Sequence, residues 1–184
     1  MQGRRDIPLS ERGRAQARTW RVPAELAQHA SWVSSPLSRA VETAELLTGR
    51  TVERESALIE MDWGDWEGST LDELRHAHGA AFAQNEARGL DFRAPGGESP
   101  REVRERLQPW LGRVATSAVP VVAVTHLGVL RVIVAAATGW DMTGKPPIRL
   151  KSDAIHSFSV DRRGQVTIVE CNLPLAPGEA RIGP

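Results

Sequence analysis

The sequence is short of several residue types, and each shortage excludes a class of protein. None of its 184 residues is tyrosine and only Cys171 is cysteine, so an intramolecular disulfide is excluded. A single thiol is typical of proteins from a reducing compartment, and we expect a cytoplasmic protein. No apolar run approaches the roughly 20 residues of a membrane-spanning helix, so we expect no membrane partner.

Net charge is absent as well. Lysine and arginine together number 23, and aspartate and glutamate together also number 23. A protein without an overall positive field is not drawn to nucleic acid, so we expect a small-molecule partner instead. Lysine occurs only at Lys145 and Lys151, and arginine therefore carries nearly all the positive charge. Most of these arginines belong on the surface, and one proposed for function needs further support.

The sequence does contain enough apolar residues for one folded domain. Hydrophobic residues make up 41% of the chain and charged residues 25%, which is typical of a globular protein that buries a core. At this length we expect a single domain over residues 1–184. No internal repeat divides it.

Helical spacing of apolar residues recurs along the chain. It predicts helices over 9–20, 36–48, 100–114 and 127–138. Ser10 and Ser35 are the N-cap residues expected for the first two, because a serine hydroxyl accepts from free amides at a helix start. The third helix is expected to open with a capping box at Ser99 and Glu102.

Strand patterns lie between these helices. Residues 31–35 and 120–126 are predicted strands, and the β-branched run of the second predicts burial on both faces. Residues 155–160 and 165–171 flank a short turn and predict an antiparallel hairpin. Weak periodicity at about 61–98, with a capping box at Thr70, predicts a cap that contains a short helix.

Alternating strands and helices predict an α/β fold in three layers, with a largely parallel central sheet between helices and a late antiparallel hairpin. In such folds, ligands bind beyond the carboxyl ends of the strands. Arg39 follows the first predicted strand and His126 ends the second. A guanidinium and an imidazole on one sheet edge suit the oxygens of a phosphoryl group, whereas either residue alone is more often structural.

Four segments, SSPLSRAVETAELL, EMDWGDWEG, PGGES and VTHLG, occur in an order that resembles the histidine phosphatase (phosphoglycerate mutase-like) superfamily, particularly its small bacterial branch near α-ribazole phosphatase. The resemblance implies a phosphomonoesterase that works through phosphohistidine, needs no cofactor and acts on a small phosphorylated metabolite. It leaves a homo-oligomer open. It implies that Arg39 and His126 line the phosphate pocket and that Glu60 is the general acid. It also implies that Gln2, Gly3 and Gly128 bind substrate.

Glu60 also makes physical sense as an acid. A carboxyl group buried under a cap with Trp63 and Trp66 nearby has a raised pKa and can protonate a leaving alkoxide. Without the resemblance, Glu60 would be taken as a surface carboxylate. The two tryptophans fit the cap core as well as they fit substrate stacking. Glu98, just before a helix, is expected to stabilise the helix dipole.

The sequence departs from the family at its start. The family's first strand ends in Arg-His-Gly and carries the nucleophilic histidine, and this chain shows no counterpart. We therefore expect a truncated and inactive chain in which Gln2 and Gly3 are mobile. The remaining histidines, His29, His76, His78 and His156, are expected to be structural or on the surface. The alternatives are a catalytically inactive module of the same fold that binds anions or proteins, and an unrelated tryptophan-rich interaction domain.

Overall fold

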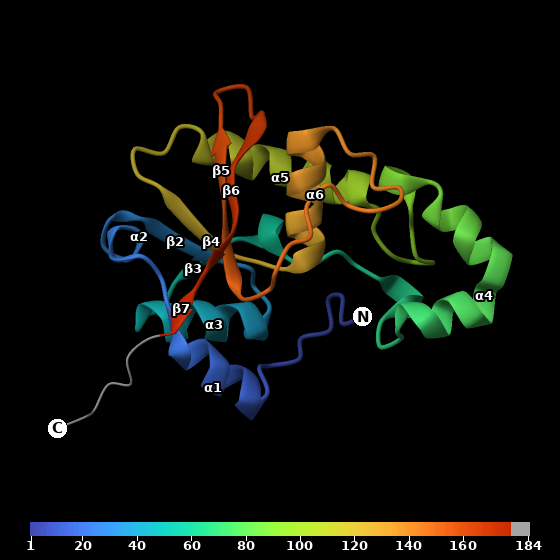
Figure 1. The fold of residues 1–184 in the computed structure, drawn as a ribbon, viewed down its shortest axis with the longest axis horizontal. Helices are drawn as coiled ribbons and strands as arrows, with labels where there is room; N and C mark the ends of the chain where they lie inside the picture. The colour runs from blue at the N-terminus through green and yellow to red at the C-terminus, as the bar shows by residue number, and fades with distance from the viewer. Residues whose placement is uncertain (178–184) are drawn as a thin grey trace.

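A parallel sheet of three strands forms the middle layer of the computed structural model, which describes residues 1–177 (Figure 1). The strands are β3 (Glu53–Arg54), β2 (Ser31–Ser34) and β4 (Val121–Val124), in the order β3-β2-β4. Both pairings are parallel, and Ser34 at the end of β2 lies opposite Val124 at the end of β4. The predicted α/β class with a parallel sheet is confirmed.

Helices cover both faces of this sheet (Figure 1). They are α1 (Glu11–Thr19), α2 (Ala24–His29) and α3 (Ser38–Thr48), followed later by α5 (Pro100–Val114) and α6 (Leu127–Thr138). Trp32 packs with Ala44 of α3, whereas the next residue, Val33, packs with Val103 of α5 and Val129 of α6. This division follows from the alternation of side chains along a strand. No helix in residues 1–177 combines the length and apolar character needed to cross a bilayer.

Two further strand pairs lie outside the parallel sheet. β5 (Ala154–Val160) and β6 (Val166–Pro174) form the predicted antiparallel hairpin, and β6 packs on α6. Asp161 closes the turn, because its carboxylate accepts from the amides of Arg163 and Gln165. β1 (Trp20–Arg21) pairs with β7 (Ala176–Pro177).

Residues 61–98 form an irregular lobe with an apolar cluster of its own. Its elements are η2 (Gly64–Trp66), α4 (Leu71–Glu86) and η3 (Gly89–Asp91). The predicted capping box at Thr70 opens α4, but this helix runs for 16 residues with an interruption at Gly79, so it is longer than expected. Trp66 packs against Phe82 and Phe92 inside this lobe, which favours the core interpretation of that tryptophan.

One large apolar cavity opens beside β4. Among the described residues, β4 pairs only with β2, and β5 pairs only with β6. Both β4 and β5 line a single cavity of about 880 Å³, here called the β4–β5 cavity. Trp32 and Leu26 line it from one side of the sheet, and Trp110 and Ile133 line it from the other. All four β4 residues are consequently only half-buried, so the prediction of burial on both faces was wrong.

Candidate active site

The three functional side chains chosen from the sequence follow the carboxyl ends of the three parallel strands. Arg39 lies in the first turn of α3 after β2, and His126 is the N-cap residue of α6 after β4. Glu60 follows β3 through η1 (Ser56–Leu58). Parallel strands bring their carboxyl ends to one edge, so this topology gathers the three residues there. Arg39 and His126 both line the β4–β5 cavity.

His126 is a buried, neutral imidazole. The residue is only 8% exposed, and its Nε2 lies 2.7 Å from Ser35 Oγ. Burial, and then the positive charges of Arg39 and Arg106, lower its pKa to about 3. The predicted N-cap role of Ser35 was wrong, because α3 begins at Ser38 with Leu37 as N-cap. The Ser35 hydroxyl instead holds the His126 ring.

We expect His126 to make the folded state less stable in acid. Its pKa lies at 6.5 in an unfolded chain and at about 3 in the folded protein, so between these values only the unfolded chain binds the proton. The free energy of unfolding therefore falls as pH drops through this window, by about 1.4 kcal/mol per pH unit from this residue. Denaturant titrations between pH 7 and pH 4 should show a shallower pH dependence in His126→Asn.

NMR of the labelled imidazole gives an independent check on His126. The His126 signal, identified by its loss in His126→Asn, should keep the shift of a neutral ring down to about pH 5. A midpoint near pH 6.5 for this ring would contradict the buried, neutral state.

Arg39 is held by the beginning of the chain. Its Nη1 donates to the carbonyl of Arg5 at 2.9 Å, and its Nη2 donates to the carbonyl of Gly3 at 2.8 Å. Burial lowers its pKa, although the charges of nearby carboxylates, Glu60 first, oppose this shift. The predicted pocket residue Arg39 thus lies beside the cavity with its guanidinium already engaged by backbone.

Gln2 and Gly3, which were predicted to bind substrate, have different environments. Gly3 is buried at φ +54°, and a Cβ there would collide with the Glu67 side chain. Gln2 is exposed. We expected both residues to be mobile, but the segment is tied at both ends: the Met1 amino group donates to Ser69 O, and Asp6 accepts from Ser38.

Glu60 is a half-buried carboxyl in an irregular segment. Its Oε1 accepts from the Met61 amide at 2.8 Å, and its Oε2 accepts from the Gly128 amide at 3.3 Å. Burial raises the pKa of Glu60, against the opposing effect of these two hydrogen bonds and of Arg39 and Arg106. The raised pKa agrees with the expectation from the sequence.

Gly128 lets α6 approach Glu60. A Cβ at this position would lie 2.4 Å from Glu60 Oε1, so any larger residue would displace the carboxyl. The structure brings the predicted residue Gly128 into the site through its amide, which contacts Glu60. Thr125 adds a second tie between these segments, because its hydroxyl donates to Leu58 O at 2.8 Å.

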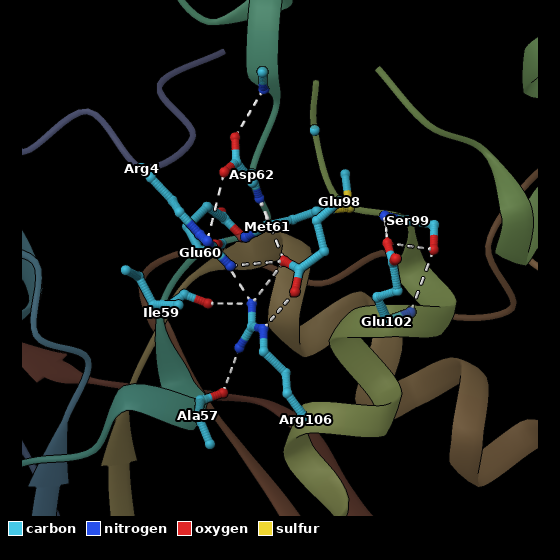
Figure 2. A network of polar contacts seen from close by, with 12 residues as sticks. Arg4, Ala57, Ile59, Glu60, Met61, Asp62, Glu98, Ser99, Glu102 and Arg106 are labelled. Carbon is cyan, nitrogen blue, oxygen red and sulfur yellow. Dashed lines mark hydrogen bonds and ion pairs between the residues drawn. The ribbon is translucent and has the colours of Figure 1, made fainter. Parts of the chain in front are cut away.

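Two arginines that contact the Glu60 segment, Arg4 and Arg106, were not predicted from the sequence. Arg106 of α5 and Arg4 both pair with Glu98, which we expected only to stabilise a helix dipole (Figure 2). A signal for Arg106 was present: it lies three residues after Val103 and four before Trp110, on the inner face of an amphipathic helix. Within residues 1–177 no group of three or more carboxylate, histidine or cysteine side chains is placed to hold a metal ion.

The remaining histidines lie outside this arrangement or have structural partners. His156 lines the β4–β5 cavity from β5, but its Nε2 lies 3.0 Å from Lys151 O and its Nδ1 accepts from the Asn172 amide. His78 packs near Trp66 in the 61–98 lobe. His29 is exposed.

Comparisons with known proteins identify the family of this chain. The family model described as histidine phosphatase superfamily, branch 1, matches residues 1–173. Glucosyl-3-phosphoglycerate phosphatase of Mycolicibacterium vanbaalenii is 34% identical over 160 residues, which span 79% of this chain and 70% of that protein. The 2,3-bisphosphoglycerate-dependent phosphoglycerate mutase of Methylobacterium radiotolerans is 33% identical over 163 residues, which span 82% of this chain and 76% of that protein.

Solved structures show the same fold. The native structure of mycobacterial glucosyl-3-phosphoglycerate phosphatase superimposes with a TM-score of 0.76 and 29% identity, covering 95% of this chain and 92% of the other. The family match extends over nearly all of the described residues and includes Arg39, Glu60 and His126. The chain therefore belongs to the histidine phosphatase superfamily, branch 1.

Proposed function

We propose that this protein is a phosphomonoesterase that acts through a phosphohistidine intermediate. The observation that carries the proposal is the convergence of Arg39, Glu60 and His126 at one edge of the parallel sheet. A guanidinium beside a neutral imidazole can bind phosphoryl oxygens through charge-assisted hydrogen bonds. A carboxyl with a raised pKa can supply the proton that a leaving alkoxide needs.

The proposed reaction has two balanced steps. A nucleophilic imidazole attacks phosphorus and the bond from phosphorus to the leaving oxygen breaks, while Glu60 gives its proton to that oxygen. Water then attacks phosphorus and gives its proton to the Glu60 carboxylate, while the bond from phosphorus to the imidazole nitrogen breaks and inorganic phosphate leaves. Arg39 and His126 hold the phosphoryl oxygens throughout, and no cofactor is needed.

The nucleophile is proposed to lie on a strand that precedes Met1 and occupies the β4–β5 cavity. Three observations support this placement. β4 and β5 each have one edge without a strand partner among the described residues, both line the cavity, and the cavity is lined by apolar side chains from both faces of the sheet. A strand buried on both faces would fit there, because it would pair with both edges. Its carboxyl end would then reach the edge where Arg39 and His126 lie.

A small phosphorylated metabolite is the proposed substrate, and the 61–98 lobe is proposed to cap the site. The relatives named above are a glucosyl-3-phosphoglycerate phosphatase and a phosphoglycerate mutase. Hydrolysis is favoured over phosphoryl transfer between metabolites, because transfer would need basic side chains over the site to hold the second metabolite. Two arginines of the lobe already pair with carboxylates. Arg75 pairs with Glu86, and Arg93 pairs with Glu102.

A catalytically inactive module that binds an anion is the second candidate, and the Arg39 contacts are compatible with it. Both Nη atoms of Arg39 donate to backbone carbonyls of residues 3 and 5. These contacts occupy two of the five N–H donors of the guanidinium, and the remaining donors can hold an anion in a chain that does not turn it over.

The chain of 184 residues is expected to hydrolyse p-nitrophenyl phosphate no faster than the buffer background. Residues 1–177 supply groups that can bind a phosphoryl group, but His126 is proposed to hold its oxygens, and none of the other described imidazoles is proposed to receive it. The measurement is release of nitrophenolate by rigorously purified protein, with His126→Ala as the matched variant. Turnover that survives purification and disappears in His126→Ala would mean that His126 itself is the nucleophile.

A further inference from the structure

Glu60 lies in a segment without regular secondary structure, so side chains must hold its backbone. Arg106, which projects from α5, does so (Figure 2). Its Nη1 donates to Ala57 O, and its Nη2 donates to Ile59 O at 2.7 Å and to Glu60 O at 3.4 Å. One guanidinium therefore binds three carbonyls of a four-residue stretch.

Two of these carbonyls flank the Cα atom of Glu60. Ile59 O belongs to the peptide group before that atom, and Glu60 O belongs to the peptide group after it. Fixing both peptide planes fixes the backbone dihedral angles of Glu60, and these angles set the direction of its Cα–Cβ bond. The contact thus acts on the side chain of Glu60 without touching its carboxyl group.

Glu98 orients the guanidinium. Its Oε1 lies 2.8 Å from Arg106 Nε, and its Oε2 lies 3.2 Å from Arg106 Nη2. The pair is largely enclosed, with side chains 20% and 12% exposed. Arg4 and the Asp62 amide also bond to Glu98 Oε2. The fork geometry of this pair leaves the outer donors of Arg106 directed at the carbonyls of the Glu60 segment.

We infer that Arg106, oriented by Glu98, is a positioning residue that directs the Glu60 carboxyl towards the amide of Gly128 and the phosphate pocket. The inference rests on the proposed function only in giving Glu60 the role of acid. A simpler explanation is that Arg106 acts as a nearby positive charge, or as a stabilising ion pair without effect on Glu60.

The substitution Arg106→Lys separates these explanations, because lysine keeps the charge but lacks the planar fork. Charged groups that face Glu60 come from three sides: Arg39 on α3, Arg106 on α5 and Arg4 in the first segment, while His126 is neutral. The Lys variant leaves all these charges in place. Positioning predicts that the pKa of Glu60 falls towards its ordinary value, because a released carboxyl turns to water and loses the burial that raises it.

The experiment is a pH titration of the 184-residue chain labelled with ¹³C at glutamate side-chain carboxyls, with Glu60 assigned by Glu60→Gln. Arg113→Lys is the matched control, since Arg113 also projects from α5 and pairs with Glu55, but is 62% exposed. We expect a lower Glu60 pKa in Arg106→Lys and an unchanged pKa in Arg113→Lys. An unchanged or raised pKa in Arg106→Lys would overturn the inference.

Thermal melting shows whether Arg106→Lys is folded. If it is not, Glu98→Gln takes its place, because it leaves Arg106 in the chain and removes the charge that orients its guanidinium and that also pairs with Arg4. The same fall in the Glu60 pKa is expected there, and its absence would equally overturn the inference. The titration needs no turnover, so its outcome is independent of whether the protein is a phosphatase.

Discussion

Restoring an upstream strand is expected to raise hydrolysis of p-nitrophenyl phosphate from background by on the order of 10⁴-fold or more, the scale on which a covalent nucleophile acts. The change is to express the protein with the in-frame codons that precede Met1, where these encode an apolar strand ending in Arg-His-Gly. Stability should rise in parallel, because each apolar side chain buried in the β4–β5 cavity contributes roughly 1.5–3 kcal/mol before the entropy of ordering is subtracted. Steady-state kinetics and denaturant unfolding measure the two gains.

A matched variant of the extended protein separates the strand from its nucleophile. Changing the histidine of the restored Arg-His-Gly to asparagine should keep the gain in unfolding free energy and abolish the gain in turnover. A stop codon just ahead of Met1, with no such run in frame, would remove the basis for the upstream strand. The anion-binding module would then be the better proposal for this chain.

Glu60→Gln in the extended protein is expected to slow hydrolysis of an alkyl phosphate by about 10²–10⁴-fold, the usual contribution of a general acid. Glutamine is close in shape to the protonated carboxyl but has no proton to give to an alkoxide. Hydrolysis of p-nitrophenyl phosphate should be much less affected, because nitrophenolate is a good leaving group. The measurement is kcat/KM for both substrates, converted to a loss of transition-state stabilisation.

Asp65→Asn is the control for Glu60→Gln. Asp65 is an exposed carboxylate of the same segment, and its replacement should leave both rates unchanged. Equal slowing of the alkyl and aryl substrates by Glu60→Gln would assign Glu60 to binding or folding and would remove it as the acid.

The sequence predicted the features that local chemistry determines. Ser10, Thr70 and Ser99 each cap a helix through an amide three residues away, so the pattern alone is sufficient. The placement of Arg39 and His126 at one sheet edge was also predictable, because the carboxyl ends of parallel strands share an edge whatever the packing.

Contacts between distant segments were not predictable from these patterns. Ser35 has the local signature of an N-cap, but its hydroxyl lies against His126, 91 positions away. The helix pattern places Arg106 on an inner face but does not indicate its partner, the carbonyl of Ile59, which lies 47 positions away. The burial of β4 was misjudged for the same reason, since a strand is buried on both faces only if its neighbours cover it.

The apolar cluster of the 61–98 lobe affects how the effects of substitutions combine. Trp66, Leu74, Phe82 and Ala94 form this cluster, and Trp63 is the residue that also packs against the main core. Substitutions within this cluster can therefore change the packing of the lobe without touching the sheet, whereas Met61 and Glu98 of the same stretch are tied to Glu60 and Arg106. Because the lobe has an apolar cluster of its own, the effects on stability of substitutions within α4 and of substitutions in the parallel sheet are expected to add independently.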